Sequence, residues 1–71
     1  MQPEQEIKGL LPKLLYTIDE AADVLGISRS LMYDLILTGQ VPSLKIGRVR
    51  RIPVVALESF VERQLAAQKG V

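Results

Sequence analysis

The residues best suited to chemistry lie in one short stretch, where an arginine stands between two serines and a tyrosine follows one helical turn later. These residues are Ser28, Arg29, Ser30 and Tyr33. An arginine can donate two hydrogen bonds to a guanine edge or pair with a phosphate, and hydroxyl groups bond to phosphates or bases. We therefore expect these side chains to meet double-stranded DNA. For Tyr33 the alternative is a half-buried ring that packs on a neighbouring hairpin.

A second group of cations follows in a segment that is otherwise apolar. It consists of Lys45, Arg48, Arg50 and Arg51. Residues 28–53 contain a single acid, Asp34, so a chain of net charge +1 can still present one strongly basic side to an anionic polymer. We expect these cations to lie along the sugar-phosphate backbone or in the minor groove. The alternative is a charged strand edge that blocks pairing with other strands. Asp34 would repel phosphate, and we expect it to pair with Arg29 or with one of these arginines.

Catalysis is the function class that the composition argues against. The chain has no cysteine and no histidine, which removes disulfides, thiolate chemistry, histidine bases and the usual zinc ligand sets. It also lacks a glycine-rich phosphate loop, and its acids Asp19, Glu20 and Asp23 fall on one wet helical face, where no pKa tuning by burial is expected. We expect no enzyme activity, no cofactor, no metal site and no small-molecule substrate.

No feature of the chain points to a membrane. No apolar run approaches the roughly 20 residues that span a bilayer, and the first residues are acidic and polar rather than basic and then apolar. We therefore expect a cytoplasmic protein that joins the nucleoid when it binds DNA. With 71 residues, the chain is expected to form one small domain at residues 14–68, preceded by a flexible arm at residues 1–13.

Two short helices joined by a tight turn should position the first group of side chains. Thr17 and Glu20 match a capping box that begins a helix, and Gly26 can end it. Ser28 is suited to cap a second helix, which Gly39 can end. A pair of this kind matches the helix-turn-helix arrangement, whose second helix lies in the DNA major groove. The alternative at this point is a generic helical hairpin, since many unrelated proteins share the pattern.

Each of the two helices carries an apolar stripe that should face the core. The stripes consist of Ile18, Ala21, Ala22 and Leu25 in the first helix, and of Met32, Leu35 and Ile36 in the second. In the second helix this leaves Arg29, Ser30 and Tyr33 on a different face. Ile27, in the turn, is expected to pack into the core.

A hairpin should position the second group of cations, since the spacing of apolar residues changes from helical to alternating. The strands are expected at Leu44–Ile46 and Arg50–Ile52. If Leu44 and Ile52 both face the core they pair directly, around a three-residue loop that places Arg48 at its tip. Lys45 and Arg51 then share the outer face, and Arg50 lies on the inner face with its stem over Ile46. A two-residue Gly47–Arg48 turn would instead put Ile52 on the wet face, so we prefer the longer loop.

Two further elements complete the expected fold. A short edge strand is predicted at Leu14–Tyr16, and Pro53 should occupy the first position of a last helix that runs to about Ala67 or Gln68. The apolar stripe of this helix consists of Leu57, Phe60, Val61 and Leu65. The predicted fold class is mainly α with a small β-hairpin, which together make a winged helix-turn-helix.

The combined pattern resembles the excisionase-type, MerR-related family of winged helix-turn-helix proteins. The resemblance is carried by residues 15–30, Tyr33, Leu35–Ile36, Gly39, Val41–Pro42, Lys45–Arg48 and Arg51–Pro53, and it covers about residues 14–62. It implies major-groove contacts for Ser28, Arg29, Ser30 and Tyr33, and wing contacts for Lys45, Arg48, Arg50 and Arg51.

The resemblance also implies a role on phages and integrative elements. Many such proteins resemble recombination directionality factors, which bind repeated sites beside an attachment site, bend the DNA and help an integrase to excise. The implied partners are therefore duplex DNA, an integrase or other recombinase, and further copies of the chain that bind DNA cooperatively. Two alternatives stay open: a small transcription regulator of the same fold, and a protein-interaction module in which the stripe of the last helix docks a partner helix.

Overall fold

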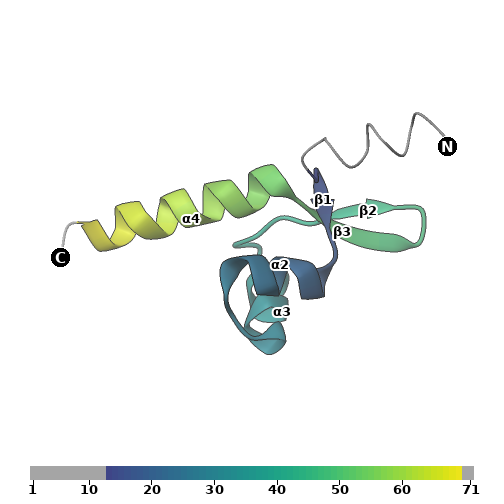
Figure 1. Ribbon diagram of the computed structural model, residues 1–71, viewed down its shortest axis with the longest axis horizontal. Coiled ribbons are helices and arrows are strands. Elements are labelled where there is room, and N and C mark those ends of the chain that lie inside the picture. The colour runs from purple at the N-terminus through teal and green to yellow at the C-terminus, as the bar shows by residue number, and fades with distance from the viewer. Residues whose placement is uncertain (1–12, 70–71) are drawn as a thin grey trace, which may run out of the picture.

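The fold consists of three helices and three short strands, and the computed structural model describes residues 13–69. In chain order the elements are β1 (Leu15–Tyr16), α2 (Ile18–Leu25), α3 (Arg29–Leu37), β2 (Leu44–Ile46), β3 (Val49–Pro53) and α4 (Val54–Lys69). Figure 1 shows that α2 and α3 pack together, while the β2–β3 hairpin and α4 extend from them in opposite directions. Of the predicted arm at residues 1–13, all but Lys13 lies outside the described residues.

The start of α2 has the predicted capping box. Thr17 Oγ1 accepts a hydrogen bond from the backbone N–H of Glu20, and Glu20 Oε1 accepts one from the backbone N–H of Thr17. Glu20 also pairs with Lys13. The Lys13 ammonium, and after it the hydrogen bond from the Thr17 backbone N–H to the carboxylate, lower the pKa of Glu20 from 4.5 to about 2, with a smaller contribution from the Thr17 hydroxyl. Through these contacts Lys13 and Thr17 are bonded to the first turn of α2.

Both helices of the pair end as predicted, at glycines with a positive φ. Gly26 has φ +70° and Gly39 has φ +78°, a backbone conformation that side chains with a Cβ rarely adopt. After α3, the N–H groups of Gly39 and Gln40 bond to the carbonyls of Ile36 and Leu35, the pattern of a Schellman motif. The short segment between Gly26 and Ser28 therefore turns sharply, and α3 packs against α2.

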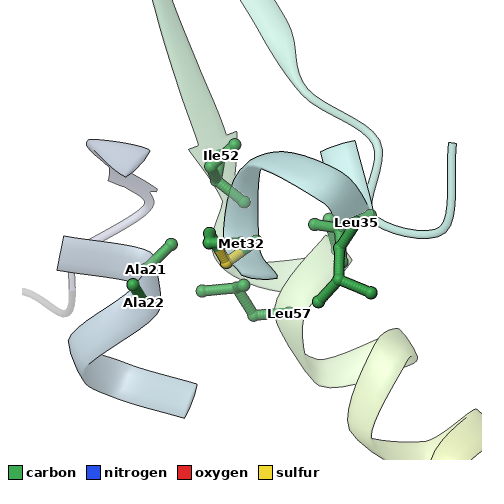
Figure 2. Close-up of a cluster of buried hydrophobic side chains, with 8 residues drawn as sticks. Ala21, Ala22, Met32, Leu35, Ile52 and Leu57 are labelled. Carbon is green, nitrogen blue, oxygen red and sulfur yellow. The ribbon is translucent and has the colours of Figure 1, made fainter. Parts of the chain in front are cut away.

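The core is small and wholly apolar. Its buried members are Ala21, Ala22, Met32, Leu35, Val41, Ile52, Ala56 and Leu57, and no buried polar residue occurs among residues 13–69. Met32 has no exposed surface and lies between the alanines of α2 and Leu57 of α4 (Figure 2). The two small alanines let α3 approach α2 closely, so Met32 fills the space that they leave. The predicted core face of α3 is confirmed.

The three strands form one antiparallel sheet in the order β1-β3-β2, with β1 at an edge. The cross-strand pairs are Leu15↔Pro53, Tyr16↔Ile52, Leu44↔Arg51, Lys45↔Arg50 and Ile46↔Val49. The predicted pairing of Leu44 with Ile52 is wrong, and the hairpin closes with the two-residue Gly47–Arg48 turn. Gly47 has φ +60° and the next residue has a negative φ, which matches a type II′ turn, the kind that fits the twist of paired strands.

This register changes the faces of the hairpin. Opposite residues share a face, so Lys45 lies with Arg50, while Arg51 lies with Leu44. The predicted sharing of the outer face by Lys45 and Arg51, and the cover of Ile46 by Arg50, are therefore both wrong. Ile52 is nevertheless fully buried, because it lies at the base of the hairpin, next to Tyr16 of β1 and the helices.

The apolar face of the hairpin is open, contrary to the predicted packing of Leu44 on the core. Leu44, Ile46 and Val49 are 42%, 50% and 45% exposed. The β2–β3 hairpin that carries them projects away from the helices (Figure 1). The hairpin is thus two-sided, with Lys45 and Arg50 on one face and the aliphatic side chains together with Arg51 on the other.

The last helix begins one residue later than predicted and ends close to the predicted position, at Lys69. Pro53 is the final residue of β3, and α4 begins at Val54, whose N–H bonds to the carbonyl of Leu14 at 2.8 Å. Leu57 is buried and Phe60 is half-buried, as predicted. Val61 and Leu65 are 42% and 67% exposed, because α4 continues past the core (Figure 1). Only the first part of the predicted stripe therefore packs inside.

Candidate nucleic-acid interface

The outer face of α3 presents all four side chains of the first predicted group. Ser28, Arg29, Ser30 and Tyr33 are exposed, and they lie at or near the N-terminal end of the helix. In helix-turn-helix proteins the N-terminal residues of the second helix are those that reach base edges. The local sequence produces this arrangement, because burial of Met32 and Leu35 turns the opposite side of α3 outward.

Ser28 has a structural role as well as an exposed hydroxyl. Its Oγ accepts a hydrogen bond from the backbone N–H of Leu31 at 3.1 Å, which caps the first turn of α3. The hydroxyl proton is not used in this contact, and a hydroxyl can donate and accept at the same time. Ser28 can therefore hold the helix end and still donate to a phosphate oxygen.

Arg29 is held by two neighbours. Its Nε lies 2.9 Å from Oδ1 of Asp19 in α2, and its Nη2 donates to the Tyr33 hydroxyl at 3.4 Å. Its guanidinium carbon lies 5.5 Å from the centre of the Tyr33 ring, within the range of a cation–π contact. The hydrogen bond with Tyr33 and the charge of Asp19 both raise the pKa of Arg29. The three side chains form one connected group on the surface of the helix pair.

The predicted partner of Arg29, Asp34, is not the one that the structure gives. Asp34 is exposed, and no ion pair of its carboxylate occurs among residues 13–69. The sequence pattern predicts only that Asp19 lies on the solvent-exposed face of its helix, and it indicates no partner for this residue. Nothing local connects two residues on different helices, so only the packing of α2 on α3 could reveal this pair.

The cations of the hairpin divide between its two faces and its turn. Lys45 and Arg50 lie opposite one another, and Arg50 Nη1 donates to Ser43 Oγ at 2.8 Å. Arg48 is exposed in the turn. Arg51 is on the other face, half-buried, and its Nη1 donates to the carbonyl of Arg50 at 2.9 Å. The structure therefore brings Lys45, Arg48 and Arg50 together as the exposed cations of the hairpin, which we call the basic wing face, and separates Arg51 from them.

Two shallow apolar hollows lie between the end of α2 and α4 and share Leu25 and Val61, and we call them together the apolar groove. Its walls include Val24 and Leu25 of α2 and Leu57, Val61 and Leu65 of α4. Glu58 and Glu62 lie on its rim. The spacing of the α4 residues predicts that they all pack in the core, but Val61 and Leu65, in the second half of that stripe, are accessible in the groove.

The described residues contain no other site that suggests a different chemistry. No group of three His, Cys, Asp or Glu residues within 13–69 could hold a metal ion. In the same part of the chain, no helix has the length and apolarity needed to cross a membrane.

Two helices with a tight turn between them, an exposed polar face on the second and a projecting basic hairpin define a winged helix-turn-helix DNA-binding domain. Comparison with known proteins supports this class. The family described as "Helix-turn-helix domain" matches residues 15–65.

Two curated relatives are similar to most of this chain. An "Excisionase" from Streptomyces ambofaciens is 43% identical over 54 residues, which cover 76% of this chain and 86% of the relative. A "Probable excisionase" from Saccharopolyspora erythraea is 40% identical over 58 residues, which cover 82% of this chain and 59% of the relative. The chain therefore spans less than two thirds of the length of the second relative. No solved structure matches the chain at a comparable level of significance. The chain belongs to the excisionase-type helix-turn-helix family.

Proposed function

We propose that this chain is a recombination directionality factor that binds specific duplex DNA without catalysing a reaction. In this proposal the N-terminal part of α3 enters the major groove, where Ser28, Arg29, Ser30 and Tyr33 meet bases and phosphates. The observation that carries the proposal is the exposed Arg29–Tyr33 pair at the start of α3. An arginine there is well placed for a guanine edge, while the tyrosine fixes its direction.

The hairpin is proposed to follow the DNA backbone. Lys45, Arg48 and Arg50 form its basic wing face, and cations of this kind supply affinity that is independent of sequence and sensitive to salt. Arg51 belonged to the predicted set, and its half-buried position on the other face supports a smaller contribution.

We further propose that several copies act together on repeated sites, bend the DNA and assist an integrase. A single module of this size covers about one turn of duplex, so adjacent copies or a recombinase would supply the remaining affinity. The names of the two excisionase relatives support this role.

A binding experiment tests the proposal. The purified chain is titrated into DNA from upstream of its own gene and from the neighbouring attachment site, with random duplex as competitor, across a salt series. The proposal expects a steep fall of log affinity with log salt and about a hundredfold preference for the native DNA. Absence of duplex binding at low salt would refute it.

Excision itself needs a second assay, because a transcription regulator of the same fold would also bind DNA. A supercoiled plasmid that carries both attachment sites is incubated with the integrase, with and without the chain. A directionality factor raises excision and binds in several cooperative steps. A regulator binds a single operator and leaves excision unchanged.

The apolar groove favours a second candidate function, which is docking of a partner protein. Val61 and Leu65 are exposed where the predicted stripe leaves the core, and Glu58 and Glu62 rim the groove. This candidate is compatible with DNA binding, since α3 and the hairpin lie elsewhere. Arg48→Gln with Arg50→Gln should weaken DNA binding and leave such docking intact, whereas Val61→Ser with Leu65→Ser should do the reverse.

A further inference from the structure

The group formed by Asp19, Arg29 and Tyr33 joins the two helices of the pair on their outer surface. Asp19 lies in the first turn of α2 and Arg29 in the first turn of α3. The Arg29 side chain is 64% exposed and the Asp19 side chain 61% exposed. An ion pair this open to water contributes little to the free energy of folding. Its main physical effect is therefore on the direction of the arginine.

The hydrogen-bond donors of Arg29 show what that direction leaves available. A guanidinium group has five N–H donors, which form two forks, one from Nε and Nη2 and one from Nη1 and Nη2. Asp19 takes Nε, and Tyr33 takes one N–H of Nη2. Nη1 makes no hydrogen bond or ion pair with residues 13–69, so its two N–H groups stay accessible to an acceptor such as a guanine edge or a phosphate.

The second contact restricts the side chain further. Tyr33 lies one turn after Arg29 on the same face of α3, and its ring is 5.5 Å from the guanidinium carbon. With Asp19 on one side and Tyr33 on the other, the guanidinium is held by partners from both helices. A long side chain that is already held loses less conformational entropy when it binds.

We propose that Asp19 is a positioning residue for DNA recognition: its carboxylate holds Arg29 in the orientation that reads a base. The inference rests on the proposed function of α3 as the DNA-reading helix. It assigns a role in specificity to an acidic residue that simple electrostatics would regard as unfavourable near DNA. If Asp19 acts only through its charge, its removal should strengthen binding to any DNA. If Asp19 positions Arg29, its removal should weaken the preference for the specific sequence.

The test compares variants on two duplexes. The first duplex is the sequence that the wild-type chain selects from a pool of randomised DNA, and the second has the same bases in shuffled order. Asp19→Ala removes the acceptor, and Asp19→Asn keeps an oxygen that can accept from Nε. Asp23→Ala is the matched control, since it removes one exposed acid from the same helix. Arg29→Ala measures the contribution of the arginine itself, and circular dichroism checks that each variant is folded.

The expected result is a loss of discrimination without a loss of general affinity. Asp19→Ala should lower the ratio of selected to shuffled binding about tenfold, within the range for one bidentate base contact, and leave shuffled DNA bound as well or better. Asp19→Asn should keep most of the ratio. Asp23→Ala should leave the ratio unchanged.

Four outcomes would overturn the inference. If Asp19→Ala tightens binding to both duplexes equally, Asp19 only competes with DNA for Arg29. If Asp19→Asn loses as much of the ratio as Asp19→Ala, the hydrogen-bond acceptor does not position the arginine. If Arg29→Ala abolishes the preference for the selected duplex and Asp19→Ala does not change it, the proposed function stands without this role for Asp19. A wild-type chain that selects no duplex overturns both proposals together.

Discussion

The different positions of the cations on the two faces of the hairpin lead to a prediction about how the affinity for DNA depends on salt concentration. Lys45 and Arg50 are cross-strand neighbours, Arg48 is exposed in the turn, and Arg51 is half-buried on the opposite face with one N–H bonded to the Arg50 carbonyl. If the basic wing face lies on the DNA backbone, the first three cations each neutralise about one phosphate and Arg51 does not.

The magnitude follows from counterion release. Each lost phosphate contact lowers the slope of log affinity against log salt by about 0.9, which corresponds to about an eightfold loss of affinity near 0.1 M salt. The triple variant Lys45→Gln, Arg48→Gln, Arg50→Gln should therefore lose about 2.7 from the slope. Arg51→Gln, the matched control, removes the same kind of charge and should leave the slope nearly unchanged.

Fluorescence anisotropy on a random duplex over a salt series measures these slopes directly. A random duplex is suitable because backbone contacts do not depend on sequence. The reasoning would be refuted if Arg51→Gln lowered the slope as much as Arg50→Gln does. The DNA would then meet the hairpin along its edge, or the cross-strand pairs would differ from those described above.

Three further predictions concern folding, and urea unfolding followed by circular dichroism measures all of them. Met32→Ala should lower the free energy of unfolding by about 2–5 kcal/mol, since this side chain has no exposed surface and fills the space between three elements. Gly47→Ala should cost about 1–2 kcal/mol, because Gly47 has φ +60° and a Cβ there meets strain of the backbone rather than a clash. Glu20 has a folded pKa of about 2 against an ordinary value of 4.5, so its contribution to stability is complete above 4.5 and is lost as the pH falls toward 2. Glu20→Gln should therefore be less sensitive to acid than the wild type over that interval.

Each of these predictions has its own control. Met32→Leu keeps most of the buried volume and should cost much less than Met32→Ala. Gly47→Asn should lose less stability than Gly47→Ala, because asparagine tolerates a positive φ. For Glu20, the Asp23→Asn variant should follow the wild-type acid curve. Equal effects of a variant and its control would contradict the physical reason given for it.

The helices of this fold could be predicted from sequence because their signals are local. The capping box of Thr17 and Glu20, the cap at Ser28 and the glycines at 26 and 39 all act within one turn of chain. The buried side of α3 followed from the spacing of Met32 and Leu35. The four predicted residues at the start of α3 were accordingly found exposed on one end of that helix.

The hairpin was harder because alternation shows which residues share a face but not which face is covered. Leu44, Ile46 and Val49 look like core residues by pattern, yet no helix within residues 13–69 lies over them where the hairpin projects. Likewise the stripe of α4 continues to Leu65 after its neighbours end. Whether an apolar side chain is buried depends on how far the neighbouring helices and strands extend in space. The spacing of apolar residues along the sequence carries no information about this. The Asp19–Arg29 pair was missed because its residues lie on two helices that only tertiary packing brings together.

The projecting half of α4 has a consequence for local unfolding. Residues 61–68 are exposed except for half-buried Gln64, and Arg63 donates to the Gln40 carbonyl. A helical segment this short is marginally stable without tertiary packing, so its opening free energy should fall toward the C-terminus. Amide hydrogen exchange should thus be slow near Leu57 and fast beyond Leu65, and uniformly slow protection along α4 would contradict this. A partner that covers Val61 and Leu65 would have to order these turns as it binds. Slower amide exchange at the end of α4 would then report binding of such a partner.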